Sequence, residues 1–366
     1  MSAAGARLLL SGYYGFDNFG DEAILQIFVS EWRRRRSADL LRVLSGSPTQ
    51  TQRLGVEAVP RTSVARIADL LRHTDVFVSG GGGLLQSSTS LRSLLYYAGL
   101  IHEAKSCGAA AVIFAQGIGP LSLMGKQIVK HSCGGVDLAI VRDEASAQLM
   151  CQLVPRTDVR VAADPVFLAP DAVPEDKERA LADEGIIGTG DLVAVVVRPS
   201  RVLEKISGEI ARVVDVLASR CGAQVIFVPF QRTTDVEAAV SIIRRCRTAP
   251  VLVGGGYDLA TMTALFKRCT AVVGMRLHAL ILAARLGVPF LAVPYDPKIV
   301  ALCQSLRYPL APLQAGTADE LTESLWAKRG ALSAHLHDAA QTQAAMASKA
   351  FDWLQELVER AAEKTP

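Results

Sequence analysis

Three consecutive residues, Arg276-Leu277-His278, could bind an anion and donate a proton from one place. They follow the apolar run Ala271–Met275 and open the apolar stretch Ala279–Leu286, which is typical of a helix. A helix that starts directly after a strand presents backbone N–H groups and the positive end of its dipole, and both favour a bound anion. Arg276 adds a guanidinium suited to phosphate or carboxylate, and His278 can give up a proton near neutral pH. We predict that Arg276 and Leu277 bind an anionic donor and that His278 is the catalytic acid.

Three further basic residues each follow a predicted strand. Arg142 comes after Leu138–Val141, Arg198 ends the run Val193–Val197, and Lys298 follows Phe290–Val293. Parallel strands end at one edge of a sheet, and ligands bind at that edge. We therefore predict that these cations and Arg276 line one crevice, where they suit a ligand that carries phosphate and carboxylate together. For Arg142 the alternative is a simple ion pair with Asp143 at a helix start.

A glycine-punctuated segment, Gly12 to Glu22, follows the first predicted strand. Asp17 and Asn18 lie in its loop, where they can contact sugar hydroxyls or deprotonate one. Asp21 and Glu22 fall in the first turn of a helix, where acidic residues also simply complement the helix dipole. We predict that Asp17 or Asp21 is the catalytic base, and that Asn18 and Glu22 bind the acceptor.

Four consecutive glycines, Gly80–Gly83, follow another predicted strand and allow a ligand to approach the backbone closely. We predict that Gly81, Gly82 and Gln116 bind the acceptor. The glycine spacing does not form the dinucleotide fingerprint. The segment Gly119–Lys126 has five residues where a P-loop has four, and Gln127 replaces its Ser or Thr, which argues against a nucleoside triphosphate site.

Short β-branched runs alternate with helical stretches along the chain, a pattern typical of parallel sheets covered by helices. The pattern predicts an α/β protein with two doubly wound, Rossmann-like domains that face a cleft. The expected boundaries are 1–170 for the acceptor domain, 171–190 for a proline-rich and charged linker, and 191–335 for the donor domain. An amphipathic helix at 340–363 is expected to pack back on the first domain.

The composition excludes several classes of protein. A net charge of +3 over 366 residues is too small to indicate nucleic-acid binding. No secretion signal or membrane-spanning run is evident, so we expect a cytoplasmic protein. Seven scattered cysteines favour free thiols, and the dispersed histidines predict no metal site. Four arginines, Arg33–Arg36, either form a solvated helix end or contact anionic lipids peripherally at the inner membrane face.

Together these motifs resemble the bacterial polysaccharide pyruvyltransferase family, especially the branch that modifies secondary cell-wall polymers for S-layer anchoring. The resemblance runs from about residue 8 to residue 300. It departs at Ser87-Ser88, where the family usually has an acidic residue, so a carboxylate role there is in doubt. The matching segments are Gly12–Gly15, Gly20–Ala23, Ser79–Gln86, Gln116–Pro120, Val141–Asp143, Ala163–Pro165, Gly274–His278 and Tyr295–Lys298.

The resemblance implies a GT-B-like fold with a C-terminal crossover helix. It also implies phosphoenolpyruvate as co-substrate without another cofactor, and a lipid-linked saccharide, with N-acetylmannosamine as the modified sugar. The product would be a 4,6-type pyruvate ketal. Two alternatives remain open: a GT-B glycosyltransferase that uses a nucleotide sugar, and a non-catalytic polysaccharide-binding relative. The sequence does not define the oligomeric state.

Overall fold

The computed structural model describes residues 5–88, 90–171, 177, 181, 182, 186 and 190–363, so most of the predicted linker lies outside the described residues. The chain divides into two compact units. The first contains Met1–Phe16, Asp21–Pro165 and Ala344–Pro366, and the second contains Asp17–Gly20 and Val166–Gln343. Both are α/β units built on an all-parallel sheet.

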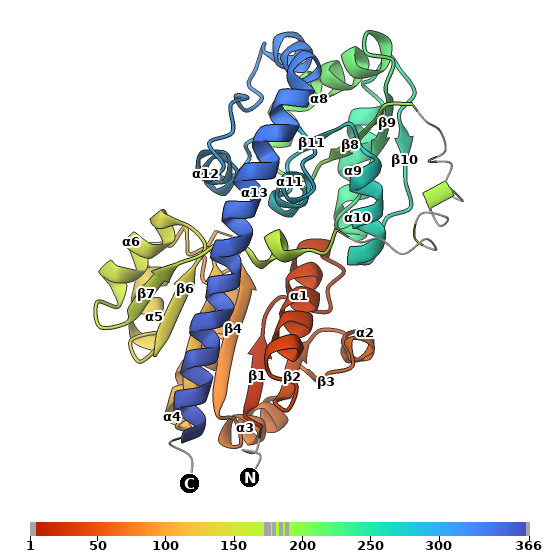
Figure 1. Ribbon diagram of the computed structural model, residues 1–366. Coiled ribbons are helices and arrows are strands. Elements are labelled where there is room, and N and C mark those ends of the chain that lie inside the picture. Colours follow the sequence, from red (N-terminus) through yellow and green to blue (C-terminus); the bar gives the residue numbers. More distant parts are fainter. Residues whose placement is uncertain are drawn as a thin grey trace. The chain divides into compact units, whose positions relative to one another are not determined.

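The first unit is a seven-stranded sheet in the order β3-β2-β1-β4-β5-β6-β7 (Figure 1). This is the Rossmann order with one added strand. The helices α1 to α6 connect its strands. The strands are β1 (Arg7–Ser11), β2 (Leu40–Ser45), β3 (Glu57–Pro60), β4 (Val76–Gly82), β5 (Ala110–Gln116), β6 (Leu138–Val141) and β7 (Asp158–Val161). The helices are α1 (Phe19–Arg35), α2 (Pro48–Thr51), α3 (Val64–Arg72), α4 (Leu91–Ser106), α5 (Leu123–Ser132) and α6 (Glu144–Leu153), with a 3-10 turn at Gln52–Leu54.

The second unit has a five-stranded sheet in the order β10-β9-β8-β11-β12, the same order over five strands. The strands are β8 (Leu192–Val196), β9 (Gln224–Phe227), β10 (Val251–Leu252), β11 (Ala271–Gly274) and β12 (Phe290–Ala292). The helices are α8 (Arg201–Ser219), α9 (Arg232–Ile243), α10 (Leu259–Arg268), α11 (Leu277–Arg285) and α12 (Pro297–Ser305), and a 3-10 turn spans Pro165–Leu168.

Local sequence accounts for most of these elements. The central strands are runs of Val, Leu, Ile and Ala buried on both faces, as expected for parallel strands covered by helices. Side chains of Ser or Asp cap the starts of many helices, as the residue preferences at that position predict. The capping residues are Ser90, Ser122, Asp143, Ser200, Asp258 and Asp296. The structure adds β3, which the sequence analysis missed because it is short, carries a glutamate and ends in proline.

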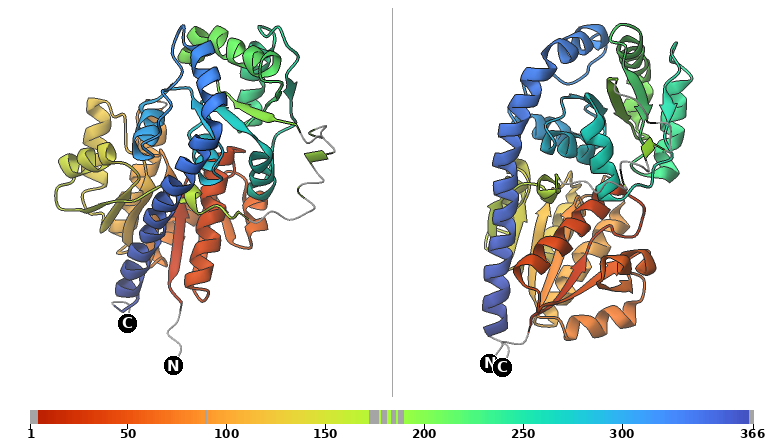
Figure 2. Two further views of the ribbon diagram at one scale, coloured as in Figure 1. Left: turned by 45° about the horizontal axis from the view of Figure 1, so that its top comes forward. Right: turned by 45° about the vertical axis from the view of Figure 1, so that its right-hand side comes forward.

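The C-terminal helix α13 (Ala318–Glu363) begins well before the predicted residue 340. Its last part is counted with the first unit, where it lies beside α1 on one face of the seven-stranded sheet (Figures 1 and 2). There Phe351 packs 5.6 Å from Phe28 of α1 and 4.9 Å from Phe114 of β5, measured between ring centroids. All three rings are almost fully buried, so this apolar stripe fixes the helix to the sheet.

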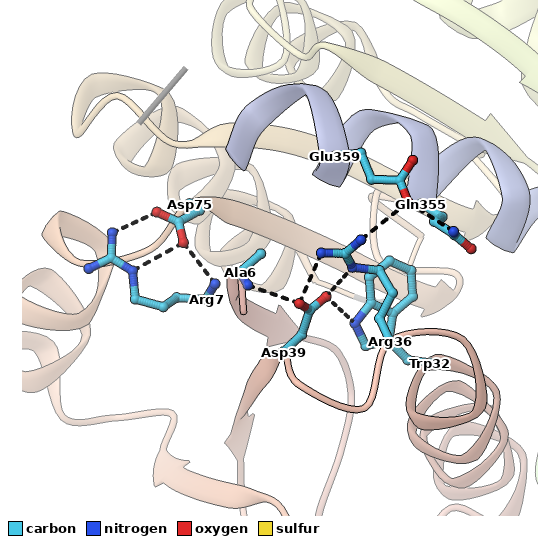
Figure 3. A network of polar contacts seen from close by, with 8 residues as sticks. All are labelled: Ala6, Arg7, Trp32, Arg36, Asp39, Asp75, Gln355 and Glu359. Carbon is cyan, nitrogen blue, oxygen red and sulfur yellow. Dashed lines mark hydrogen bonds and ion pairs between the residues drawn. The ribbon is translucent and has the colours of Figure 1, made fainter. Parts of the chain in front are cut away.

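Charged residues at the amino end of this sheet serve the fold (Figure 3). Asp75 accepts hydrogen bonds from the backbone and the guanidinium of Arg7, and these bonds outweigh burial and lower the pKa of its carboxyl. Arg36 binds Asp39 and reaches Glu359 of α13 at 3.2 Å. Arg35 binds Asp352 and Ser348 of α13. These arginines therefore secure α13.

The other two arginines of the run also have intramolecular partners. Arg33 donates to the carbonyls of Leu54 and Gly55, and Arg34 binds Glu31. Each guanidinium of the run therefore has an acceptor within the protein, while Arg33 and Arg34 remain exposed, and the predicted lipid contact stays a prediction. The acceptors are close because α1 ends beside α13 and beside the 3-10 turn at Gln52–Leu54.

Candidate functional site

Strand order reverses between β8 and β11 in the second unit, the point where sheets of this type bind ligands. Val196 and Ala292 both pair with Gly274, so β8, β11 and β12 end at one level. Arg198 follows β8 by two residues, Arg276 follows β11 by two, and Tyr295 follows β12 by three. Three predicted donor-site segments therefore meet at one edge of one sheet.

Arg276 is buried, and most of its guanidinium is bound by side chains of the same unit. Nε lies 2.9 Å from Asp235 Oδ2, and Nη2 binds Asp235 Oδ1 and contacts Gln231 Oε1 at 3.3 Å. Asp235, only 1% exposed, also accepts the backbone N–H groups of Phe230 and Gln231. The carboxylate neutralises much of the charge of Arg276. In the part of the chain that the structure describes, Nη1 makes no hydrogen bond and is the end left for a ligand.

Arg198 and Lys298 gather around Tyr295. Arg198 Nη1 donates to the Tyr295 hydroxyl at 3.0 Å, so this contact crosses the end of β11, which lies between β8 and β12. Lys298 Nζ lies 5.5 Å from the Tyr295 ring centroid and 3.5 Å from Asp296. Among the described residues, no carboxylate lies within 4.0 Å of Arg198, and its buried Nε has no partner. Arg198 is thus the cation of this edge whose charge is least compensated.

His278 is half-buried in the first turn of α11. Within the second unit, Gly20 approaches it so closely that a Cβ at Gly20 would lie 1.9 Å from His278 Nδ1. The neighbouring Phe19 amide donates to the Phe230 carbonyl at 2.9 Å, and the two rings pack edge to face. The predicted residues Asp17 and Asn18 belong to this same short segment, and Asp17 has a left-handed φ of 53°. Their predicted roles stay predictions.

In the first unit, strand order reverses between β1 and β4; Gly12 follows the end of β1, and glycines end β4. The Tyr14 ring fills the space where Gly12 would carry a Cβ, and its hydroxyl lies 2.6 Å from the Cβ position of Gly80. Asp21 Oδ1 lies 2.6 Å from the Cβ position of Gly82, whose φ is +77°. Ile24 Cγ2 lies 2.3 Å from the Cβ position of Gly81. Side chains from the α1 region therefore occupy the glycine edge.

Tyr14 is a buried hydroxyl that the sequence analysis did not single out. It is 1% exposed, and its oxygen has no hydrogen-bond partner among the described residues. Burial, together with the charges of Asp21 and Glu22, raises the pKa of Tyr14, so the phenol stays protonated. Glu22 itself holds the loop, because its Oε1 accepts the backbone N–H groups of Gly15 and Phe16 at 2.7 and 3.2 Å.

Gln116 and Arg142 lie on the neighbouring strand ends. Gln116 is fully buried, and its Nε2 donates to the carbonyl and hydroxyl oxygens of Ser79 at 2.7 and 2.8 Å. Arg142 lies over Gly117 and reaches Asp164 at 3.4 Å, whereas its contact with Asp143 is 3.9 Å. Asp143 caps α6. Arg142 belongs to the first unit and the three other predicted cations belong to the second, so its predicted donor-binding role stays a prediction.

The cysteines form no disulfide bonds. All seven cysteines are free thiols, and burial raises the pKa of Cys133 and of Cys269 to about 12. No group of three His, Cys, Asp or Glu residues suited to a metal occurs in the described ranges. Of the helices described, none is long and apolar enough to cross a bilayer.

Asp235, Tyr295 and Asp164 were missed as partners of the predicted cations. Asp235 follows β9 by eight residues and Tyr295 lies in the segment that the sequence analysis quoted, so position after a strand was a usable signal for both. The pairing of each with its cation depends on strand order, which the sequence does not state.

Comparison with known proteins agrees with this architecture. The chain is similar in fold to the Anabaena protein HepE in complex with UDP and glucose, with 13% identity, a TM-score of 0.66, and 97% of this chain and all of that chain covered. It is also similar to a Rickettsia africae glycosyltransferase, with 10% identity, a TM-score of 0.64, and 99% of this chain and 100% of that chain covered. A third similar structure is the Neisseria meningitidis UDP-GlcNAc 2-epimerase bound to UDP-GlcNAc, with 10% identity, a TM-score of 0.64, and 96% of this chain and 100% of that chain covered.

These identities show the fold alone, which is GT-B-like with Rossmann-like units. No curated protein matches the chain in sequence. The family model for polysaccharide pyruvyl transferase matches residues 18–297. This range contains the glycine-rich end of β4 in the first unit and the Arg276–His278 segment of the second. The chain therefore belongs to the polysaccharide pyruvyl transferase family.

Proposed function

We propose that this transferase moves the pyruvyl group of phosphoenolpyruvate onto a hexose of a lipid-linked cell-wall polysaccharide precursor. The modified sugar is N-acetylmannosamine, the product is a 4,6-type ketal, and phosphate is released. Phosphoenolpyruvate is the only small co-substrate, and no further cofactor takes part. In this proposal the enzyme acts in the branch that prepares secondary cell-wall polymers for S-layer anchoring.

One observation carries the donor assignment: Arg198, Arg276 and His278 share the switch point of the five-stranded sheet. Arg198 keeps an uncompensated charge, and α11 adds the positive end of its dipole. Phosphoenolpyruvate carries a phosphate and a carboxylate on three carbons, so it needs such a compact cationic edge. Lys298 and the Nη1 end of Arg276 supply the remaining contacts, and the backbone at Leu277 approaches the donor.

The reaction needs one acid and one base. His278 donates a proton to the methylene carbon of phosphoenolpyruvate, and the double-bond electrons form the new C–H bond, which leaves positive charge on the adjacent carbon. A sugar hydroxyl attacks that carbon, and Asp17 or Asp21 accepts its proton. Phosphate then leaves with the C–O electron pair, and the second hydroxyl closes the ring while its proton passes to phosphate. Asn18, Glu22, Gly81, Gly82 and Gln116 orient the acceptor, and Arg142 stabilises the strand end beside them.

The test is phosphate release from phosphoenolpyruvate, with and without a diphosphate-linked disaccharide that bears N-acetylmannosamine. We expect acceptor-dependent release and a product heavier by one pyruvate ketal. His278→Gln should lower kcat by about 10²–10⁴-fold, because a positioned proton donor contributes that much. His337→Gln, at an exposed histidine of the same unit, is the matched control and should keep wild-type kcat. Unchanged kcat in His278→Gln would contradict the acid assignment.

A nucleotide-sugar glycosyltransferase is the second candidate, because the similar structures of HepE and the epimerase contain UDP or UDP-sugars. Saturable binding of UDP-glucose without phosphate release from phosphoenolpyruvate would favour it. The third candidate, a non-catalytic polysaccharide-binding relative, predicts saccharide binding with neither reaction.

The replacement at Ser87 is the observation that favours this third candidate. In this chain Ser87 replaces the acidic residue usual in the family, and its hydroxyl accepts a hydrogen bond from the Ser122 amide at 2.7 Å.

A further inference from the structure

The start of α5 in the first unit carries two adjacent, strongly exposed apolar side chains. Leu123 is 85% exposed and Met124 is 60% exposed. The other large apolar residues that stand exposed in the described ranges are single, with none next to another in sequence. Burying such side chains gains about 25 cal/mol per Å², so an adjacent exposed pair indicates a surface that something covers.

The rest of the outward face of α5 carries basic residues and the neutral Gln127. Gly125 and Val129 face the core, while Lys126, Lys130 and His131 are exposed with Leu123 and Met124 on the opposite side. The helix contains no acidic residue. We name Leu123, Met124, Lys126 and Lys130 the α5 patch.

The neighbouring helix α4 extends this surface. Leu94 of α4 lies 3.2 Å from the Cβ position of Gly125, and His102 stacks 5.3 Å from His131, so the two helices pack along their length. The next residue of α4, Leu95, is 50% exposed. Arg92 is exposed one turn earlier, and the single acidic residue of α4, Glu103, lies three turns from the helix start.

We propose that the α5 patch docks the first unit on the anionic surface of a lipid bilayer. Charge complementarity selects this occupant, because protruding apolar side chains flanked by lysines match an acyl boundary beneath anionic head groups. A second copy that met the patch with its own patch would place lysines opposite lysines, which disfavours a symmetric dimer through this surface. The few apolar side chains also fall short of the roughly 800 Å² per partner of a stable protein interface.

The position of the patch links it to the proposed function. The helix α5 follows the carboxyl end of β5, the edge that holds Gln116 and, on the next strand, Gly81 and Gly82. Docking through this patch therefore holds the predicted acceptor edge of the first unit near the bilayer, where a lipid-linked saccharide is displayed. The docking itself requires neither phosphoenolpyruvate nor the saccharide.

The experiment is co-sedimentation of the full chain with vesicles of phosphatidylglycerol mixed with phosphatidylcholine, and with vesicles of phosphatidylcholine alone. We expect binding to the mixed vesicles that weakens between about 0.1 M and about 1 M salt, where screening shortens from roughly 10 to 3 Å. Lys126→Ala with Lys130→Ala should weaken binding about 30-fold, since each basic residue near such a surface contributes about 1 kcal/mol. Leu123→Ser with Met124→Ser should weaken it at least about tenfold.

Two controls match these variants. Lys205→Ala with Lys328→Ala removes the same charge from exposed positions of the second unit and should bind like the wild type. Val64→Ser alters the 78% exposed valine at the start of α3 and should do the same. Unfolding midpoints equal to wild type would show that every variant folds, as expected for exposed positions.

Three results would overturn the proposal: no binding of the wild type to the anionic vesicles, undiminished binding of the patch variants, or equal losses in the controls. A concentration-dependent dimer that Leu123→Ser with Met124→Ser abolishes, without vesicle binding, would identify a second copy as the occupant. Phosphate release with a soluble acceptor should be unchanged in the patch variants. The docking proposal and the proposed function can therefore fail separately.

Discussion

At the scale of single residues, the structure shows which cations at the end of the five-stranded sheet already have a carboxylate partner. The sequence drew attention to Arg276, but Asp235 binds its Nε and Nη2 atoms in a buried pair. Arg198 lies on the adjacent strand end with a tyrosine hydroxyl as its partner and keeps its positive charge available. We infer that the Asp235–Arg276 pair fixes the start of α11 and that Arg198 provides most of the attraction for an anion.

The buried pair gives the first prediction of this section. Asp235→Asn should lower the free energy of unfolding by about 3–5 kcal/mol, because it leaves the Arg276 guanidinium buried without its countercharge. Asp319→Asn is a matched control, since Asp319 binds Arg212 with the same two-bond geometry at 2.6 and 2.7 Å. That pair is exposed, so the urea midpoint should hardly move. Similar losses in both variants would contradict the role assigned to burial.

At the scale of elements, aromatic packing and surface charge both attach the end of α13 to the seven-stranded sheet. Phe351 is fully buried against Phe28 and Phe114, so we expect this packing to contribute more to the free energy of unfolding than the ion pairs do. The ion pairs from the Arg33–Arg36 run to α13 lie at the rim, where solvent screens them.

The second prediction separates these two contributions. Phe351→Ala should lower the free energy of unfolding by about 3–5 kcal/mol, the usual cost of emptying a buried aromatic site. Asp352→Ala, at the next residue, removes the ion-pair partner of Arg35. Because the Asp352 side chain is 53% exposed, this change should lower the free energy of unfolding by less than about 1 kcal/mol. Urea unfolding of both variants measures the difference. A larger loss for Asp352→Ala would mean that charge, and not packing, holds the helix.

At the scale of the whole molecule, the chain uses one architecture twice. Both sheets place glycine-rich or charged segments at the point where strand order reverses, and the family model spans both units. The two edges nevertheless differ in chemistry. The first unit presents glycines, a buried phenol and carboxylates, which suit hydroxyl groups, whereas the second presents cations and a helix start, which suit an anion.

This division predicts where each substrate slows hydrogen exchange. Phosphoenolpyruvate should protect the amides that follow β8, β11 and β12, and the diphosphate-linked saccharide should protect those that follow β4 and β5. At about 100 times Kd, local opening that releases the ligand should slow about 100-fold, equivalent to about 2.7 kcal/mol. Mass spectrometry of peptic fragments measures this. Protection of the first unit alone by phosphoenolpyruvate would reverse the assignment of the donor.

The sequence alone determined the class of fold, the strands that carry the site and the family, because these depend on local periodicity and on motifs contiguous in the chain. Runs such as Val272–Met275 predict a buried strand wherever they lie, and the order of the motifs needs no structure to be recognised. Among the strands that the structure describes, only β3 was missed, since a four-residue strand with a charge and a proline has too weak a pattern.

Tertiary structure decided the partners of the side chains that those motifs supply. Asp235 and Arg276 are 41 residues apart, and Arg198 and Tyr295 are 97 apart, so their pairing follows from the order of strands across the sheet. The same holds for Arg35 and Asp352, which are 317 residues apart and which give the arginine run a partner on α13. The type of a charged side chain indicates what it can bind, but the fold determines whether a carboxylate of the same chain already pairs with it.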